Sequence, residues 1–214
     1  MKVFRPEFFH NKNTTLKESL FLIIVALCLS NLNAQVQLRL EPGVLLETGS
    51  ENLGVMLNIE PKVKASENTV IGLRFGIAIN SQKFEIDDST PFFIDDLDDN
   101  GMFSFVSTFD YYLNENYYRP YIGLGLGYYF FNNIDVSRRD GATDVLEGSV
   151  NNQLGLLLRG GLDLGNTRFG LEYNFITKAD IEIPNGQIIG TVDNSYLGIS
   201  IGFIIVGRKK QEKL

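Results

Sequence analysis

The sequence predicts an all-β protein, a single antiparallel up-and-down barrel of eight strands. Three observations in its 214 residues predict this fold. Apolar residues alternate with other residues along most of the chain, and a period of two is the signal of a strand. The connectors between the alternating segments take turns between short and long. No stretch reaches the roughly 20 apolar residues of a membrane-spanning helix, so the chain can enter a bilayer only as a closed, transmembrane sheet.

The first element is an N-terminal segment, residues 1–34, that differs from the rest of the chain. Four basic residues precede an apolar run from Leu20 to Leu29, and a small, polar stretch then ends at Ala34. That order is typical of a secretory signal peptide, and the apolar run is too short for a stop-transfer helix. We expect cleavage after Ala34 and export of the remaining chain through the inner membrane.

Cleavage at this point removes the only histidine and the only cysteine, His10 and Cys28. The mature chain then has no disulfide, and it lacks the histidine base and the thiol on which most nucleophilic catalysis depends. Loss of four basic and two acidic residues leaves 15 basic and 24 acidic residues, a formal charge of −9. This charge argues against nucleic acid as a partner, because phosphate binding needs a basic face.

Residues 35–206 carry eight alternating segments. They span residues 36–47, 53–64, 69–80, 102–113, 121–131, 152–164, 168–177 and 195–206. Each has 10 to 13 residues, close to the length that a tilted strand needs to cross a bilayer. Pro42 and Pro61 lie within the first two segments, and because proline donates no ladder hydrogen bond they predict bulges there.

Every segment has one side-chain row without charge. In chain order the rows contain Leu38, Leu57, Ile77, Phe105, Leu124, Leu156, Leu171 and Ile199. The opposite rows combine many glycines with charged residues of both signs. The charged residues are Arg39, Glu41, Glu60, Lys62, Arg74, Asp110, Arg159, Asp163, Arg168 and Glu172. Glu47 and Lys64 share these rows at segment ends, where we expect water.

Two kinds of barrel share this pattern. In a soluble barrel the apolar rows point inward, and the other rows form a wet surface that should be crowded with Lys, Glu and Thr rather than Gly. In a membrane barrel the apolar rows meet lipid, and small or ion-paired residues fill a narrow lumen. The ten charged residues comprise five of each sign, and unpaired buried charges are too costly to tolerate. The sequence therefore favours a membrane barrel whose lumen is plugged by an ion network of these ten residues.

The connectors predict the orientation of the barrel. Short connectors at 66–68, 114–120 and 165–167 alternate with long ones at 81–101, 132–151 and 178–194. Bacterial membrane barrels have short periplasmic turns and longer outer loops. With the N-terminus inside, all three long connectors lie outside the cell, and the short connector at 49–52 is the exception among the outer loops.

Aromatic residues gather at both ends of the segments. They are Tyr111, Tyr112, Tyr117, Tyr118 and Tyr121 around one short turn, and residues 128–131 at the other end of the fifth segment. Two such bands match the interfacial girdles of membrane barrels, although tyrosine and phenylalanine also favour strands in general.

Two segments carry a family resemblance. The sequence YIGLGLGYYF at 121–130 alternates glycine with apolar residues, and GISIGF at 198–203 has the pattern of a terminal barrel strand. The chain resembles the small outer-membrane β-barrel family of outer-membrane protein A-like, porin-family barrels, especially those of Bacteroidota. The resemblance implies a Gram-negative outer membrane and recognition by the barrel-assembly machinery. Family members often end on the terminal aromatic residue, whereas eleven residues follow Phe203 here, ending in a basic tail, 207–214, that we expect in the periplasm.

Three classes of function fit this reading. The first is a membrane anchor or structural protein that sits in outer-membrane lipid and binds a surface ligand or protein through 81–101, 132–151 and 178–194. The second is a narrow porin-like channel for small solutes, which a lumen filled by ion pairs disfavours. The third is an enzyme, with Asp163 and Glu172 as candidate acid–base groups. We expect no enzyme and no cofactor.

The acidic connector at 81–101 contains a partial calcium motif. Asp96, Asp98 and Asn100, followed by Gly101, match the opening of an EF-hand loop. The twelfth position is Ser107 rather than the bidentate glutamate. The motif is incomplete, and a solvated acidic loop is the alternative.

Overall fold

The computed structural model describes a defined part of the chain. The described residues are 36–48, 53–81, 84–87, 90–94, 99–138 and 146–206. The predicted signal peptide at 1–34, the connector at 49–52 and the basic tail at 207–214 lie outside them. Within the described ranges, no helix is long and apolar enough to cross a membrane.

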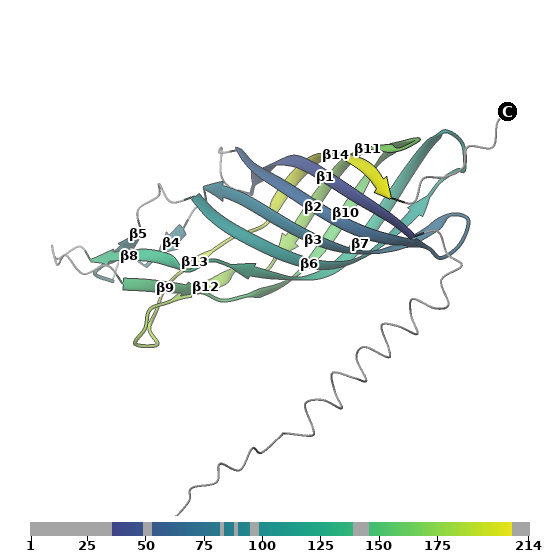
Figure 1. The fold of residues 1–214 in the computed structure, drawn as a ribbon. Helices are drawn as coiled ribbons and strands as arrows, with labels where there is room; N and C mark the ends of the chain where they lie inside the picture. The colour runs from purple at the N-terminus through teal and green to yellow at the C-terminus, as the bar shows by residue number, and fades with distance from the viewer. Residues whose placement is uncertain are drawn as a thin grey trace, which may run out of the picture. The chain divides into compact units, whose positions relative to one another are not determined.

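Eight long strands form a closed barrel (Figure 1). They are β1 (Val36–Glu47), β2 (Leu53–Lys64), β3 (Thr69–Ser81), β6 (Asp99–Tyr112), β7 (Tyr118–Phe131), β10 (Gln153–Leu164), β11 (Thr167–Ile176) and β14 (Tyr196–Val206). Each pairs antiparallel with the long strand that follows it in the chain, and β14 pairs with β1 to close the cylinder. The predicted fold class, an eight-stranded antiparallel up-and-down barrel, is confirmed.

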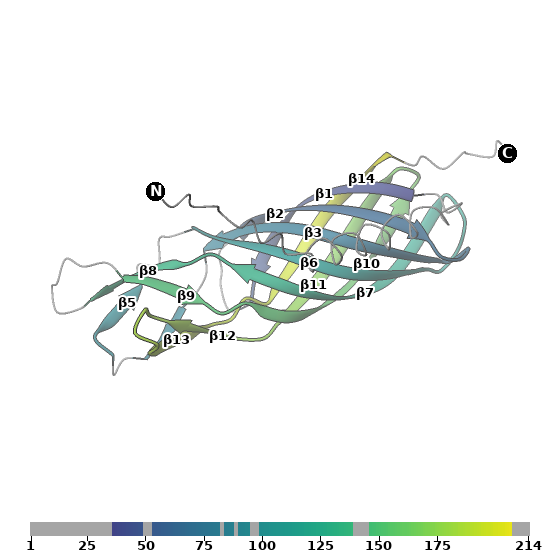
Figure 2. The same ribbon diagram turned by 60° about the horizontal axis from the view of Figure 1, so that its bottom comes forward.

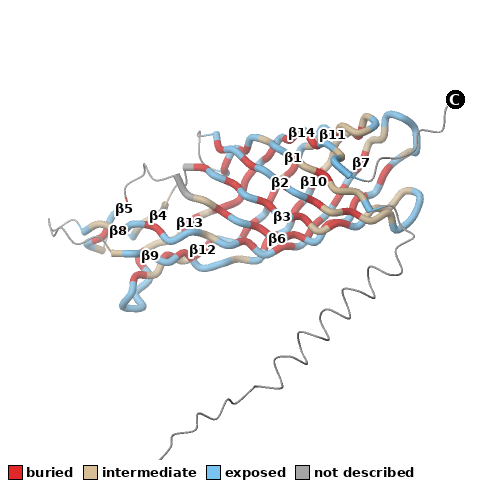
Figure 3. Tube along the Cα trace, in the orientation of Figure 1, coloured by how far each residue is buried: buried red, intermediate tan, exposed pale blue. Residues whose placement is uncertain are grey.

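Alternation along these strands separates two faces. In Figure 3 buried and exposed positions follow one another along the barrel strands. The turns at one end are short: Leu164 pairs with Thr167, which leaves two residues for the β10–β11 turn. Gly165 has a φ of 60° there, a left-handed conformation that glycine adopts without steric cost.

The two strand prolines do not produce the predicted bulges. Across β1 and β2 the pairing passes through Pro42 and Pro61 without a change of register. The irregularity on β1 lies instead between Leu38 and Arg39, on the side that faces β14. A missing ladder donor therefore left the register intact, because regular pairing on both sides of each proline maintains it.

Six short strands form a second sheet within the long connectors. They are β4 (Phe84–Ile86), β5 (Phe92–Ile94), β8 (Ile134–Arg138), β9 (Leu146–Val150), β12 (Ala179–Glu182) and β13 (Ile188–Val192). Their order in the sheet is β4-β13-β12-β9-β8-β5. This outer sheet extends beyond one end of the barrel (Figures 1 and 2) and belongs to the same compact unit. The sequence predicted these connectors only as loops.

The outer sheet has its own apolar core. Ten buried residues form it: Phe92, Ile94, Ile134, Val136, Val150, Ala179, Ile181, Ile183, Ile189 and Val192. Phe131, at the end of β7, packs against this core and also against an apolar cluster inside the barrel. The strands were missed because each has only three to five residues, too few for a period of two to emerge from the sequence.

Candidate functional site: the barrel interior and its outer face

The outward face of the barrel is apolar. Leu124 and Leu154 are each 60% exposed, and Ile199 is 57% exposed. Large apolar side chains from all eight long strands share this exposure, and together they form a belt around the barrel. Soluble monomers rarely expose contiguous apolar patches above a few hundred Å², so a belt of this extent marks a surface made for an apolar environment.

Aromatic residues edge the belt, but only part of the predicted girdle faces outward. The exposed members are Tyr111, Tyr117 and Tyr118 at the short-turn end and Tyr128 and Phe130 at the other end. Tyr112, Tyr121 and Tyr129 are buried and point into the barrel. The prediction was wrong for these three, because Tyr112 and Tyr129 each follow another tyrosine and Tyr121 precedes the outward Ile122, so all three fall in the inward side-chain rows.

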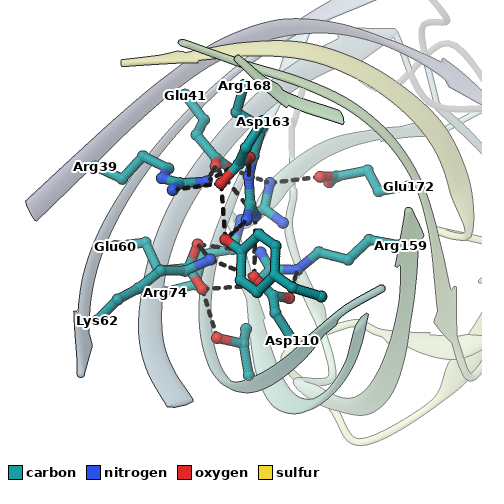
Figure 4. Close-up of polar contacts among 12 residues, drawn as sticks. Arg39, Glu41, Glu60, Lys62, Arg74, Asp110, Arg159, Asp163, Arg168 and Glu172 are labelled. Carbon is teal, nitrogen blue, oxygen red and sulfur yellow. Dashed lines mark hydrogen bonds and ion pairs between the residues drawn. The ribbon is translucent and has the colours of Figure 1, made fainter. Parts of the chain in front are cut away.

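The ten charged residues of the inward rows lie together inside the barrel (Figure 4). Each residue is 0–5% exposed, and they come from β1, β2, β3, β6, β10 and β11. Five cations thus share one small volume with five carboxylates, and every cation has a carboxylate within 4 Å. The structure places the ten residues in a continuous network.

Asp110 and Glu60 form one half of the network. The Asp110 carboxylate accepts Lys62 Nζ at 2.5 Å, Arg159 Nε at 2.8 Å and Arg168 Nη1 at 3.0 Å. Glu60 accepts both terminal nitrogens of Arg159, at 2.7 and 3.1 Å, and the hydroxyl of Thr108. Such charge-assisted, partly bidentate bonds offset the cost of taking these charges out of water.

Asp163 organises the half nearer the short turns. It accepts Arg168 Nε at 2.7 Å, two nitrogens of Arg39 at 3.1 and 3.3 Å, and the Tyr112 hydroxyl at 2.8 Å. The Arg168 guanidinium also lies 3.7 Å from the centre of the Tyr121 ring, a cation–π contact. The two buried tyrosines therefore serve the ion network rather than the interfacial girdle.

Arg74 and Glu172 extend the network toward the outer sheet. Arg74 Nη2 donates to Glu172 at 2.6 Å, Asn174 Nδ2 donates to the same carboxylate at 3.0 Å, and Tyr129 donates to Asn174 at 2.7 Å. Asp163 and Glu172, the acid–base groups of the enzyme alternative, are thus both held by arginines. Both carboxylates are buried inside the barrel, at 4–5% exposure.

Glycines on the neighbouring strands provide the space for these side chains. A Cβ on Gly72 would lie 2.7 Å from Glu60 Oε1, and one on Gly202 would lie 2.9 Å from Glu41 Cγ. Neither β7 nor β14 contributes a charge to the network, and both present glycine to it. The glycine-rich inward rows are therefore the complement of the long charged side chains opposite.

An apolar layer lies inside the barrel on the side of the outer sheet. It consists of Leu45, Met56, Ala78, Met102, Val106, Tyr129, Leu157, Ile176 and Tyr196. The sequence analysis did not identify this layer, although its members share the inward rows and lie toward one end of each strand. Glu47, expected in water, is only 2% exposed at the same level.

The calcium motif is only partly described. Asp96 and Asp98 lie outside the described residues. Asn100 and Gly101 belong to β6, where they pair with Asn80 and Ile79 of β3 instead of turning through a loop. Among the described residues, no group of three or more His, Cys, Asp or Glu side chains is placed to hold a metal ion.

Comparison with known proteins gives similarity in solved structures alone. No family model matches the chain, and no curated protein matches it. The outer membrane protein OprG from Pseudomonas aeruginosa is similar at 14% identity and a TM-score of 0.48, over 81% of this chain and 97% of that one. A major outer membrane protein from Thermus thermophilus has 13% identity and a TM-score of 0.48, over 79% and 99%. Neisserial surface protein A has 13% identity and a TM-score of 0.46, over 78% and 94%. The fold of this chain rests on its own strand pairing.

Proposed function

We propose that the chain is an outer-membrane β-barrel protein with a closed lumen, an anchor that presents its outer sheet as an interaction surface. The observation that carries the proposal is the inversion of the barrel: an apolar belt faces outward and an ion-paired network lies within. Water around the belt would impose a large hydrophobic cost, whereas lipid removes that cost. The closed sheet leaves no unpaired edge, as a bilayer demands.

The two layers inside the barrel support a closed lumen. The ion network occupies the half near the short turns, and the apolar layer occupies the half near the outer sheet. A water-filled path for solutes would need an unfilled bore, whereas side chains of both layers occupy the inside of the barrel. We therefore prefer an anchor to a porin-like channel.

The outer sheet supports an interaction role. Three connectors far apart in the sequence fold together around one apolar core, which fixes the positions of the side chains that they expose. A preorganised surface loses less conformational entropy on binding than mobile loops do. Its location follows from the proposed orientation, with the short turns and the tail at 207–214 in the periplasm and the signal peptide at 1–34 removed during export.

Selective labelling tests membrane placement and orientation together. The mature chain from residue 35 has no cysteine, so single cysteines can be introduced at Gln187, in the turn between β12 and β13, and at Glu115, in a short turn of the barrel; both residues are exposed. A membrane-impermeant maleimide should label Gln187→Cys in intact cells, and Glu115→Cys only after the outer membrane is permeabilised. The opposite pattern would reverse the orientation, and a chain found in the soluble fraction would refute the anchor.

A further inference from the structure

Four buried polar atoms beside the ion network lack a hydrogen-bond partner among the described residues. They are Arg39 Nε, Glu41 Oε1, Asn58 Nδ2 and Arg74 Nη1. Their residues are each 2–3% exposed and come from three adjacent strands, β1, β2 and β3. Buried polar groups without partners are rare and costly, and where they cluster they indicate a bound small molecule.

Glu41 differs from the other four carboxylates of the network. Each of those has a cationic nitrogen at 2.5–2.7 Å. The nearest guanidinium nitrogens of Arg168, Arg39 and Arg74 lie 3.8, 3.9 and 3.9 Å from the Glu41 carboxylate. A polar separation beyond about 3.5 Å suggests a bridging water between the groups.

The strand register brings the four residues to one place. Glu41 and Asn58 are directly opposite each other across β1 and β2, so their side chains start about 5 Å apart. Arg39 precedes Glu41 by two positions and shares its inward face. Met56, next to Asn58 on that face, covers Gly43, where an added Cβ would lie 2.6 Å from Met56 Cε. The apolar layer thus closes this site on the side of the outer sheet.

The chemistry of the four atoms specifies the occupant. We propose that Arg39, Glu41, Asn58 and Arg74 hold buried water. Three of the atoms donate and one accepts, and a water molecule accepts two hydrogen bonds and donates two, so at least two waters satisfy the four atoms. A monovalent anion would lie against the Glu41 carboxylate, and a cation would lie against three guanidiniums. The network already balances five positive against five negative charges, so a neutral ligand preserves that balance where an ion does not.

Magnetisation transfer from water tests the site in the folded protein. We would record ¹⁵N-resolved water cross-relaxation spectra of the mature chain in nanodiscs and compare two buried asparagine amides. The Asn58 amide should show a cross-peak with water. Asn174 is the matched control: its Nδ2 donates to Glu172 at 3.0 Å and its Oδ1 accepts Tyr129 at 2.7 Å, so its amide should show none. The Tyr129 hydroxyl exposes the control to exchange-relayed transfer, which makes the comparison stringent.

Asn58→Leu removes the side-chain amide, so the signal that disappears in this variant belongs to Asn58. If the variant does not fold, selective isotope labelling assigns the signal instead. Absence of a water cross-peak at Asn58 overturns the proposal. Equal cross-peaks at Asn58 and Asn174 that persist in Tyr129→Phe, which removes the hydroxyl relay, also overturn it, because they show a generally hydrated lumen instead of a local site. A cross-peak at Asn58 alone supports it, whether or not the outer sheet binds a partner.

Discussion

The barrel and the outer sheet are two β-structures of one chain with opposite interiors. Inside the barrel, ten charged residues pair beneath an apolar layer, while apolar side chains cover the outside. Inside the outer sheet, every core residue is apolar, and charged residues such as Glu85, Asp135 and Glu147 are exposed. The difference fits the proposed surroundings, lipid for the barrel and water for the outer sheet, since the surroundings determine which row of an alternating strand is buried.

Phe131 lies where the two arrangements meet, since it packs against both apolar clusters. Substitutions on either side of this point should therefore obey opposite rules.

Removing one charge from the barrel interior should have the largest effect. Asp110→Asn leaves Lys62, Arg159 and Arg168 without their shared carboxylate, and an uncompensated buried charge costs about 3–5 kcal/mol. Urea unfolding on lipid vesicles, followed by heat-modifiable gel migration, measures the loss. The control is Asp135→Asn on the exposed face of the outer sheet, where the change should stay within about 0.5 kcal/mol. Equal stability of the two variants would contradict the ion network.

Truncating a side chain in the apolar core of the outer sheet should destabilise that sheet and leave the barrel folded. Ile181 is fully buried there, and Ile181→Ala should cost the outer sheet about 2–5 kcal/mol. Hydrogen exchange should rise in β4, β5, β8, β9, β12 and β13, while the barrel keeps its heat-modifiable migration. Ile188→Ala, at a residue that is 56% exposed, is the matched control and should change little. Loss of the barrel together with the sheet would show that they fold as one unit.

A charge on the belt tests the lipid-facing assignment. Leu124, in the middle of β7, is 60% exposed, and arginine near the bilayer midplane costs about 2–4 kcal/mol. Leu124→Arg should therefore unfold at lower urea in vesicles. Gln187→Arg, at an exposed residue in the turn between β12 and β13, should change stability by less than about 0.5 kcal/mol. A Leu124→Arg protein as stable as the parent would mean that this face meets water.

The proposed closed lumen predicts an ion conductance near zero. Purified protein in planar bilayers should show no steady conductance, because the ion network and the apolar layer both obstruct the path. A stable open state in the unmodified chain would restore the channel alternative. Removing part of the apolar layer by Leu157→Gly alone should not open a path, because the ion network beneath it is unchanged.

The sequence predicted the barrel because its strands are long enough for a period of two to be visible, and it predicted the ten charged residues because they share one phase. It did not predict their partners: Arg39 and Asp163 are 124 positions apart, and no local pattern encodes that distance. Tyr112 and Tyr121 were assigned to the girdle because composition does not distinguish a lipid-facing tyrosine from one that bonds an arginine. The outer strands were missed because their stability comes from a shared core that no single connector contains.

Closure of the barrel joins the first and last described strands, from Glu47 opposite Tyr196 to Leu38 opposite Val206. In a polypeptide without β14, the facing edges of β1 and β11 have no strand to pair with. Arg168 also loses its cover, since Gly202 of β14 lies opposite it in the register. Such a fragment has no stable resting state in either lipid or water. Because β14 pairs with both β1 and β11, the closed barrel forms only when this strand is present.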